Sequence, residues 1–218
     1  GEVRYWDSTV NVHEDGILAT ASLPPPPIVA AQQAEARAMM AEIAAALDYV
    51  GVLTGEFFAT DAGPVFNEMA PRVHNSGHWT IEGAVASQFE NHIRAIAGLP
   101  LGSTATRQLP VVMRNLIGAD IDSVPALLAD GAAHVHHYGK AEVRAGRKLG
   151  CEAAALSDVV VVRRSLDARA RNAEPMHVLT VELTCALPAL PRSAPAATVE
   201  ILGPPEPESP PLRIDWPA

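Results

Sequence analysis

The sequence has few cysteines, no long apolar run and too few basic residues to balance its acidic ones, and each shortage excludes a class of protein. The two cysteines, Cys151 and Cys185, are too few for a disulfide framework and match no zinc spacing. No apolar run approaches the roughly 18 residues that a membrane-spanning helix needs. Sixteen Lys and Arg against 25 Asp and Glu give a net charge of -9, which argues against a nucleic-acid partner. We therefore expect a soluble, cytoplasmic protein that binds neither a membrane nor nucleic acid.

What the chain does have is a series of short helical and strand patterns with clear breaks between them. At 218 residues and 48% apolar composition it can bury the core of one large domain or two small ones. Apolar residues at helical spacing predict an amphipathic helix over residues 30–47, after a run of prolines at 24–27. Good turn residues at 61–63 predict a hairpin between strands at 52–60 and 64–69. A second helix is expected over residues 87–97, where Gly98 and Pro100 provide the stop signals.

Changes in composition divide the chain into three parts. The elements above fall within residues 1–102, and a smaller unit with a strand, a short helix and another strand follows over 103–150. From residue 151 a β-branched run, an arginine-rich stretch and a proline-rich stretch succeed one another. That composition predicts a poorly ordered tail over 151–218.

The predicted hairpin brings two acidic residues together. If the turn is centred on Ala62, Glu56 lies directly opposite Glu68 on one face of the strand pair. Like charges at that spacing are destabilising unless a cation lies between them, and Mg²⁺ characteristically takes one or two carboxylates. The alternative, which the spacing leaves about equally open, is a solvated edge with a register slipped at Pro64.

A polar loop follows the second acid. Arg72 offers a planar fork of donors for a carboxylate or phosphate, and His74 and Asn75 could orient a small anion. A zinc site from His74 and His78 lacks a third ligand at a typical spacing, so it is the weaker interpretation. The plain structural alternative is a capped helix entry at Asn75 or Ser76.

Several separate motifs, in order, resemble 5-carboxyaminoimidazole ribonucleotide synthetase of the ATP-grasp superfamily. They cover roughly residues 2–150 and comprise Asn67-Glu68 through Trp79-Thr80, Ser87-Gln88-Phe89-Glu90, His92, Arg94-Ala95-Ile96, 98–102, Tyr138-Gly139-Lys140, Arg144 and Gly146-Arg147-Lys148. The resemblance implies an α+β chain: an ATP-grasp large lobe, with an antiparallel sheet and flanking helices, followed by a small β-rich domain and the tail. It also implies a carbon–nitrogen ligase of purine synthesis, in which ATP and bicarbonate form carboxyphosphate and 5-aminoimidazole ribonucleotide is carboxylated, and a homodimer.

The resemblance also implies roles for individual residues. It makes Glu56 and Glu68 the Mg²⁺ ligands and places His13, Asn67 and Glu68 at the ATP site. Arg72 and His74 would hold the ribonucleotide with Asn75 beside the bicarbonate, and these three would form the catalytic group. Lys140 and Arg147 would clamp the ribonucleotide phosphate. The segment before His13, residues 5–10, departs from the family pattern.

The same comparison indicates that the chain is a part of a longer enzyme. The family regions that grip the phosphates and adenine of ATP precede Gly1, so we expect the chain alone to be inactive. The resemblance stops near Gly150, which suggests a reading-frame change there. The alternatives are a non-catalytic fragment that binds a ribonucleotide phosphate, a remnant without function, and the related formate-dependent glycinamide ribonucleotide transformylase.

Overall fold

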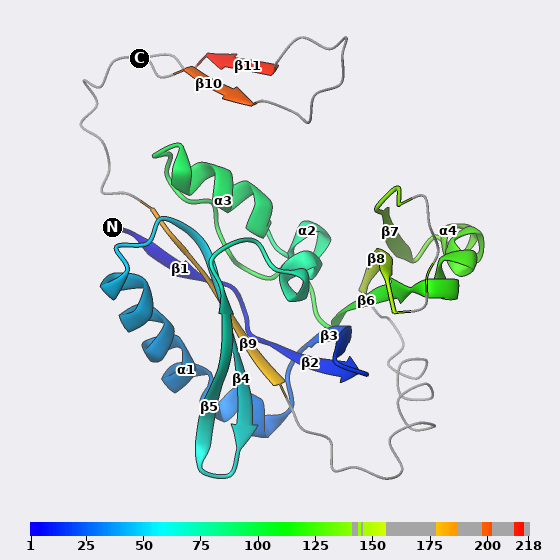
Figure 1. Cartoon of the computed structure of the whole chain (residues 1–218), viewed down its shortest axis with the longest axis horizontal. Helices are drawn as coiled ribbons and strands as arrows, with labels where there is room; N and C mark the ends of the chain where they lie inside the picture. The colour runs from blue at the N-terminus through cyan, green and yellow to red at the C-terminus, as the bar shows by residue number, and fades with distance from the viewer. Residues whose placement is uncertain (141–143, 145, 156–177, 187–197, 202–211, 216–218) are drawn as a thin grey trace.

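A computed structural model describes residues 1–140, 144, 146–155, 178–186, 198–201 and 212–215 of the chain (Figure 1). Its centre is a nine-stranded sheet with the order β5-β4-β9-β2-β3-β6-β8-β7, and β1 pairs with β9 outside this path. Every pairing of neighbouring strands is antiparallel. The predicted α+β class, an antiparallel sheet with flanking helices, is therefore confirmed. None of the helices in the described ranges is long and apolar enough to cross a membrane.

The strands and helices follow the predicted elements closely over the first 140 residues. The strands are β1 Val3–Tyr5, β2 Thr9–Glu14, β3 Ile17–Leu23, β4 Gly51–Thr60, β5 Gly63–Ala70, β6 Val111–Ile117, β7 Ala133–His137, β8 Lys148–Ala155, β9 Val178–Cys185, β10 Thr198–Ile201 and β11 Leu212–Asp215. The helices are α1 Pro27–Ala46, α2 Thr80–Gly83, α3 Gln88–Ile96 and α4 Val124–Asp130, with short 3-10 turns η1 Asn75–Trp79 and η2 Gly118–Ser123. Among the strands that the structure describes, β10 and β11 pair only with each other.

Helix α1 begins three residues earlier than its apolar pattern predicts. Pro27 occupies the first turn, where its missing N–H has no partner to lose, so the last proline of the run starts the helix and does not belong to the break. Val29, Ala36, Met40 and Ala44 are the buried face of α1. They pack against β4 and β9 in the main apolar core. These four residues recur at helical spacing, so they form one apolar face, and this face holds α1 against one side of the sheet.

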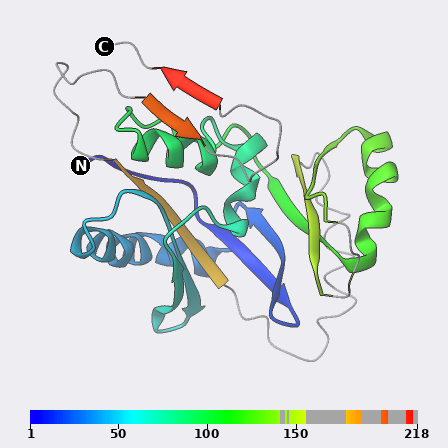
Figure 2. The same ribbon diagram turned by 45° about the horizontal axis from the view of Figure 1, so that its top comes forward.

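The opposite face of the sheet carries α2 and α3 (Figure 2). Ser87 caps α3, because its Oγ accepts a hydrogen bond from Glu90 N at 3.1 Å. A second core on this face contains Trp6 and Trp79, and Trp6 Nε1 donates to Ala86 O at 2.9 Å. The chain between β5 and α3 is thereby held against the sheet, which positions the polar loop that the sequence singled out.

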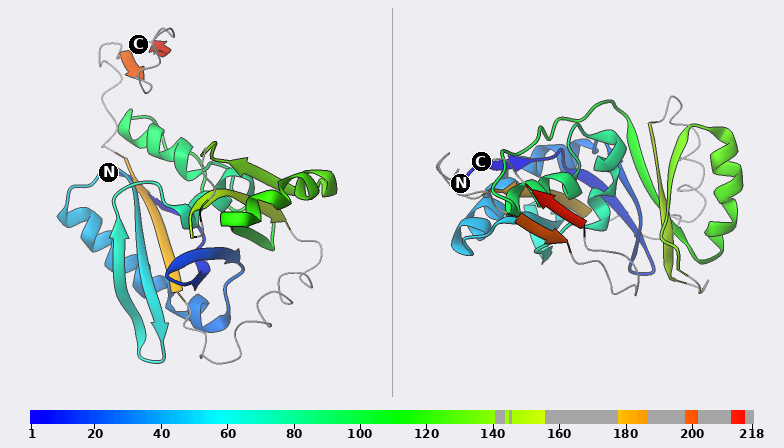
Figure 3. Two further views of the ribbon diagram at one scale, coloured as in Figure 1. Left: turned by 45° about the vertical axis from the view of Figure 1, so that its right-hand side comes forward. Right: turned by 90° about the horizontal axis from the view of Figure 1, so that it is seen from above.

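The division between residues 1–102 and 103–150 stays a prediction. Strands β6, β7 and β8 with α4 stand at one end of the molecule (Figure 3), as a small β-rich unit would. β6 nevertheless pairs with β3 through four residue pairs, from Thr20 with Arg114 to Leu23 with Val111. The two parts therefore share one sheet.

The prediction of a poorly ordered tail from residue 151 is wrong where the structure has strands, at residues 151–155, 178–185, 198–201 and 212–215. Residues 151–155 continue β8, and β9 is a fully buried strand in the middle of the sheet, between β4 and β2 (Figure 1). Thr180, Glu182 and Thr184 alternate with apolar residues in β9, although the strand is buried on both faces. Because a strand buried on both faces usually has a continuous apolar sequence, these polar residues in a proline-rich region did not predict one. The rest of the tail prediction falls on 156–177, 187–197, 202–211 and 216–218, outside the described residues.

Candidate metal and nucleotide site

The β4–β5 hairpin sets Glu56 opposite Glu68, as the sequence predicts, although the register reaches this pair in an unexpected way. Near the turn the pairs are offset by one position from the prediction, with Thr60 opposite Gly63 and Phe57 opposite Phe66. The register then shifts, because Asn67 is an extra residue in β5. The bulge at Asn67 restores the predicted pairing at the acids. Both the slipped register and the opposed carboxylates are therefore present.

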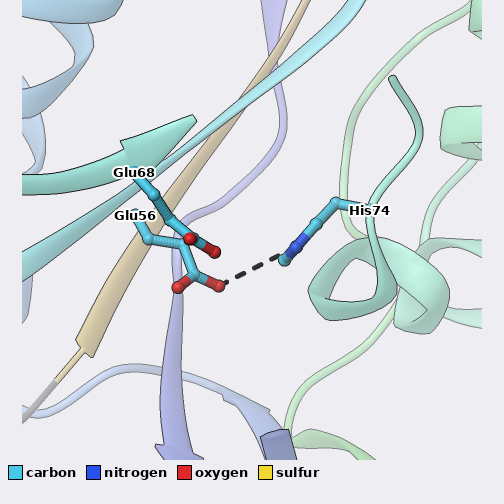
Figure 4. Close-up of side chains that lie close together, drawn as sticks. All are labelled: Glu56, Glu68 and His74. Atoms are coloured by element: carbon cyan, nitrogen blue, oxygen red, sulfur yellow. Dashed lines mark ion pairs between the residues drawn. The ribbon is translucent and has the colours of Figure 1, made fainter. Parts of the chain in front are cut away.

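A histidine from the following loop completes this group. The ligand atoms of Glu56, Glu68 and His74 all lie within 4.8 Å of one another, and His74 Nδ1 lies 3.9 Å from Glu56 Oε1 (Figure 4). Glu56 is buried with 5% of its surface exposed, whereas Glu68 is exposed. Such a mixed set of two carboxylates and an imidazole can hold a divalent cation.

The electrostatics of the group favour a bound cation. Burial first, and then the charge of Glu68, raise the pKa of Glu56, while Lys148 and a hydrogen bond from the Asn67 side chain oppose this shift. Burial and the neighbouring cations, Arg72 first, lower the pKa of His74 to about 4. His74 is therefore neutral at pH 7, with a ring nitrogen able to accept a proton or bind a metal.

The loop that carries His74 is held rigidly by Gln88 at the start of α3. Gln88 Oε1 accepts from His74 N and its Nε2 donates to His74 O, both at 2.7 Å, and the residue is fully buried. The 3-10 turn η1 follows at once, and the His74 side chain accepts from Ser76 N at its start. The capped-entry interpretation is thus correct in its geometry, with His74 rather than Asn75 or Ser76 as the cap.

The zinc pair of His74 and His78 is not formed. His78 Nδ1 instead contacts Tyr138 Oη at 3.0 Å and Cys151 Sγ at 3.6 Å, on the side of β8. In the part of the chain that the structure describes, His78 belongs to no group of possible metal ligands.

Lys148, at the start of β8, reaches the candidate site but is not among the site residues that the sequence predicts. Its Nζ donates to Asn75 Oδ1 at 2.8 Å, and the same oxygen accepts from Asn115 Nδ2 at 2.7 Å. Lys148 is half-buried, and burial lowers its pKa while the charge of Glu56 opposes that shift. The Gly146-Arg147-Lys148 motif marks this segment, but the direction of each side chain depends on where β8 begins, and the sequence does not show that.

The other predicted site residues, His13, Arg72, Lys140 and Arg147, differ in how they are placed relative to the group of Glu56, Glu68 and His74. His13, at a register shift in β2, is near enough to Lys148 and Glu68 for both charges to affect its pKa, which burial lowers most. Arg72 is exposed and its Nη1 donates to Val73 O at 2.9 Å, within its own loop. Lys140 Nζ donates to Lys148 O at 2.8 Å and lies 5.7 Å from the centre of the Tyr138 ring. Arg147 is half-buried and its N–H donates to Arg144 O.

Comparison with known proteins finds family matches for the two parts of the chain that carry this site. Residues 1–89 match the ATP-grasp domain, and residues 111–151 match the phosphoribosylaminoimidazole carboxylase C-terminal domain. The N5-carboxyaminoimidazole ribonucleotide synthase of Brucella melitensis is 55% identical over 152 residues, which cover 69% of this chain and 41% of that protein. The Escherichia coli synthase is 49% identical over 150 residues, with the same two coverages of 69% and 41%.

Two solved structures of synthases with this name resemble the chain in fold and in sequence. The N5-carboxyaminoimidazole ribonucleotide synthetase of Thermus thermophilus is 46% identical with a TM-score of 0.68, over 81% of this chain and 48% of that one. The synthase of Aspergillus clavatus, in complex with ADP and 5-aminoimidazole ribonucleotide, is 31% identical with a TM-score of 0.65, over 74% and 47%.

This chain belongs to the N5-carboxyaminoimidazole ribonucleotide synthase family. It spans about two-fifths of the length of the curated relatives it matches, 41% in the Brucella melitensis case. The matches favour the synthase over the transformylase alternative. Within this family member, strand β9 lies outside both matched domains, since those end at residues 89 and 151.

Proposed function

We propose that this chain supplies the metal-binding and ribonucleotide-binding part of an ATP-grasp carbon–nitrogen ligase. The reaction is the ATP- and bicarbonate-dependent conversion of 5-aminoimidazole ribonucleotide to N5-carboxyaminoimidazole ribonucleotide, through carboxyphosphate, in purine biosynthesis. The observation that carries the proposal is the convergence of Glu56, Glu68 and His74 within 4.8 Å, in a chain of this family. Family membership also supports a cytoplasmic homodimer.

Mg²⁺ fits the acidic pair. Glu56 is buried beside a second carboxylate, and that arrangement raises its pKa and destabilises the metal-free site unless a cation is present. Glu56 and Glu68 would hold the ion, with the Asn67 amide beside them. When bound, Mg²⁺ neutralises charge on the phosphate oxygens of ATP. His13, Asn67 and Glu68 form the edge of the proposed nucleotide site.

The ribonucleotide is proposed to lie on the other side of His74. Because Nδ1 of the neutral imidazole accepts from Ser76 N, its Nε2–H is left as a hydrogen-bond donor to the ribonucleotide. Asn75, fixed by Asn115 and Lys148, would orient the bicarbonate. Arg72, Lys140 and Arg147 would grip the phosphate, and we add Lys148 to this set. A local cluster of cations is necessary for a phosphate ligand, because the chain as a whole carries a charge of -9.

The test is a calorimetric titration of the chain with 5-aminoimidazole ribonucleotide in the presence of Mg²⁺. We expect saturable binding that weakens by about tenfold in Lys148→Met, since a charged hydrogen bond contributes roughly 1.5–3 kcal/mol. The matched control is Arg107→Met, because Arg107 is an exposed cation that donates to Val85 O. Absence of binding by the unmodified chain would refute the proposal.

ADP formation separates the catalytic from the non-catalytic alternative. ADP that appears only when both the ribonucleotide and bicarbonate are present assigns the whole reaction to this chain. Ribonucleotide binding without ADP formation assigns it the binding role alone.

A further inference from the structure

Strand β9 brings a buried acid to the same face of the sheet as the proposed metal ligands. Thr180 pairs with Glu56 and Glu182 pairs with Thr54, two residues along β4. Directly paired residues of an antiparallel sheet project from the same face, as do residues two apart in one strand. Glu182 therefore projects from the face that carries Glu56, although it comes from a segment that neither matched domain includes.

The Glu182 side chain is enclosed completely. Only 4% of the residue is exposed, its Oε1 accepts a hydrogen bond from Thr54 Oγ1 at 3.4 Å, and its Oε2 has no partner in the described part of the chain. Burial raises the pKa of Glu182 to about 8, so the carboxyl group is mainly protonated at pH 7. A neutral carboxyl group at this place acts through its shape and its hydrogen bonds, and not through charge.

The shape of Glu182 fits one glycine of the His74 loop. A Cβ atom added to Gly77 would overlap the carboxyl group, and would lie 2.6 Å from its carbon. Gly77 does not have the left-handed backbone conformation that requires glycine elsewhere in the chain. Its lack of a side chain is therefore explained by the carboxyl group of Glu182 against which it packs.

Gly77 is coupled directly to the proposed site. Its N–H donates to His74 O at 3.1 Å, and its carbonyl oxygen accepts from Thr80 Oγ1 at 2.6 Å. A displacement of Gly77 would move the turn η1 and, with it, His74 and Asn75. The opposing support comes from Gln88, which holds the backbone of His74 from the α3 side.

We propose that Glu182 is a positioning residue, whose buried side chain supports Gly77 and thereby keeps His74 beside Glu56. The role of the positioned group in metal and ribonucleotide binding rests on the proposed function. The support of the loop itself does not, because it follows from the contacts of Glu182 alone. Residues 178–185 are then an integral part of the site and not an appendage to it.

The decisive experiment is a double-mutant cycle with Gly77→Ala and Glu182→Ala, measured by Mn²⁺ affinity and by hydrogen exchange of the peptide that spans residues 74–79. Each single change is expected to weaken Mn²⁺ binding by about tenfold and to speed exchange, through overlap in the first case and lost support in the second. The double variant is expected to recover to within about threefold of the unmodified chain, because the new methyl group fills part of the space that the carboxyl group leaves.

Glu182→Gln is the conservative control. It keeps the shape and accepts the bond from Thr54, so it should bind Mn²⁺ within about twofold of the unmodified chain. If Gly77→Ala unfolds the protein, recovery of the folded circular dichroism spectrum in the double variant still supports the proposal. Additive losses in the double variant, or unchanged exchange in both single variants, would overturn it.

The same measurements separate the two proposals. If the unmodified chain binds no Mn²⁺, the proposed function fails, and the exchange of the 74–79 peptide alone decides the role of Glu182. If Mn²⁺ binds but exchange and affinity are insensitive to Glu182→Ala, the positioning role fails and the proposed function stands.

Discussion

The opposed pair Glu56 and Glu68 predicts that one substitution will stabilise the metal-free protein and remove its response to metal. Glu68→Gln keeps the size of the side chain and removes one of two like charges. Two charges about 5 Å apart repel by about 3 kcal/mol at an effective dielectric constant of 20. Because Glu68 is exposed, solvent screening reduces this, and we expect a gain in unfolding free energy of about 0.5–1 kcal/mol.

Metal should reverse that order. At a free Mn²⁺ concentration of about 100 times its dissociation constant, the unmodified chain gains about 2.7 kcal/mol, which raises Tm by roughly 5–10 °C. The Glu68→Gln variant has lost a ligand, so we expect it to melt about 1–4 °C above the unmodified chain in EDTA but to gain little from Mn²⁺.

The assay is thermal unfolding followed by circular dichroism, with and without Mn²⁺, and Glu42→Gln, an exposed acid on α1, is the matched control. The pH dependence gives a second check. Because the folded-state pKa of Glu56 is raised, its contribution to the stability of the metal-free protein is present at low pH and is lost as pH rises through that pKa. Glu68→Gln should reduce this loss. A variant that is less stable in EDTA, or that responds to Mn²⁺ as fully as the unmodified chain, would refute the reasoning.

Three further predictions concern neighbouring groups. The pKa of His74 falls to about 4 on folding, so its contribution to stability is present above pH 6.5 and lost as pH falls toward 4; His74→Gln should flatten that part of a urea-unfolding profile. Gln88→Ala should cost about 1–3 kcal/mol of unfolding free energy, since it leaves the N–H of His74 without its partner and the C=O of His74 with only the N–H of Gly77; denaturant titration against the control Gln33→Ala measures this. Cys151 and Cys185 are buried, so a thiol reagent should modify neither in the native chain and both in denaturant; rapid native labelling of Cys185 would contradict the position of β9.

The sequence predicts most of the helices and strands, but it predicts less well how the strands pair. Helix α1 and the pair Glu56 and Glu68 show the difference. The helical period from Ala36 to Ala44 is a local pattern, so α1 could be located without knowledge of its partners. The pairing of Glu56 with Glu68 depends on turn length and on a bulge. The assumed turn was wrong by one position, and Asn67 supplied the compensating residue that no propensity indicates.

The site itself could be predicted only in part, because burial and direction are properties of the whole fold. Arg72 and Lys148 carry the same charge in the sequence, yet Arg72 is exposed and bonds to its own loop, while Lys148 reaches Asn75 from a strand about 70 residues away. Only the placement of β8 beside β6 decides which of these cations faces the acids.

Strand β9 shows that the two faces of the central sheet differ in polarity. Its odd-numbered residues Leu179, Val181 and Leu183 belong to the core that packs against α1. Thr180, Glu182 and Thr184 face the other way and are equally buried, which costs free energy unless each polar group has a partner. The Oε2 of Glu182 and the Oγ1 of Thr184 have none among the described residues. A sheet built only for stability would gain from apolar residues at these positions, so the retained polar row is better explained by the loop and the acids that it supports than by the core.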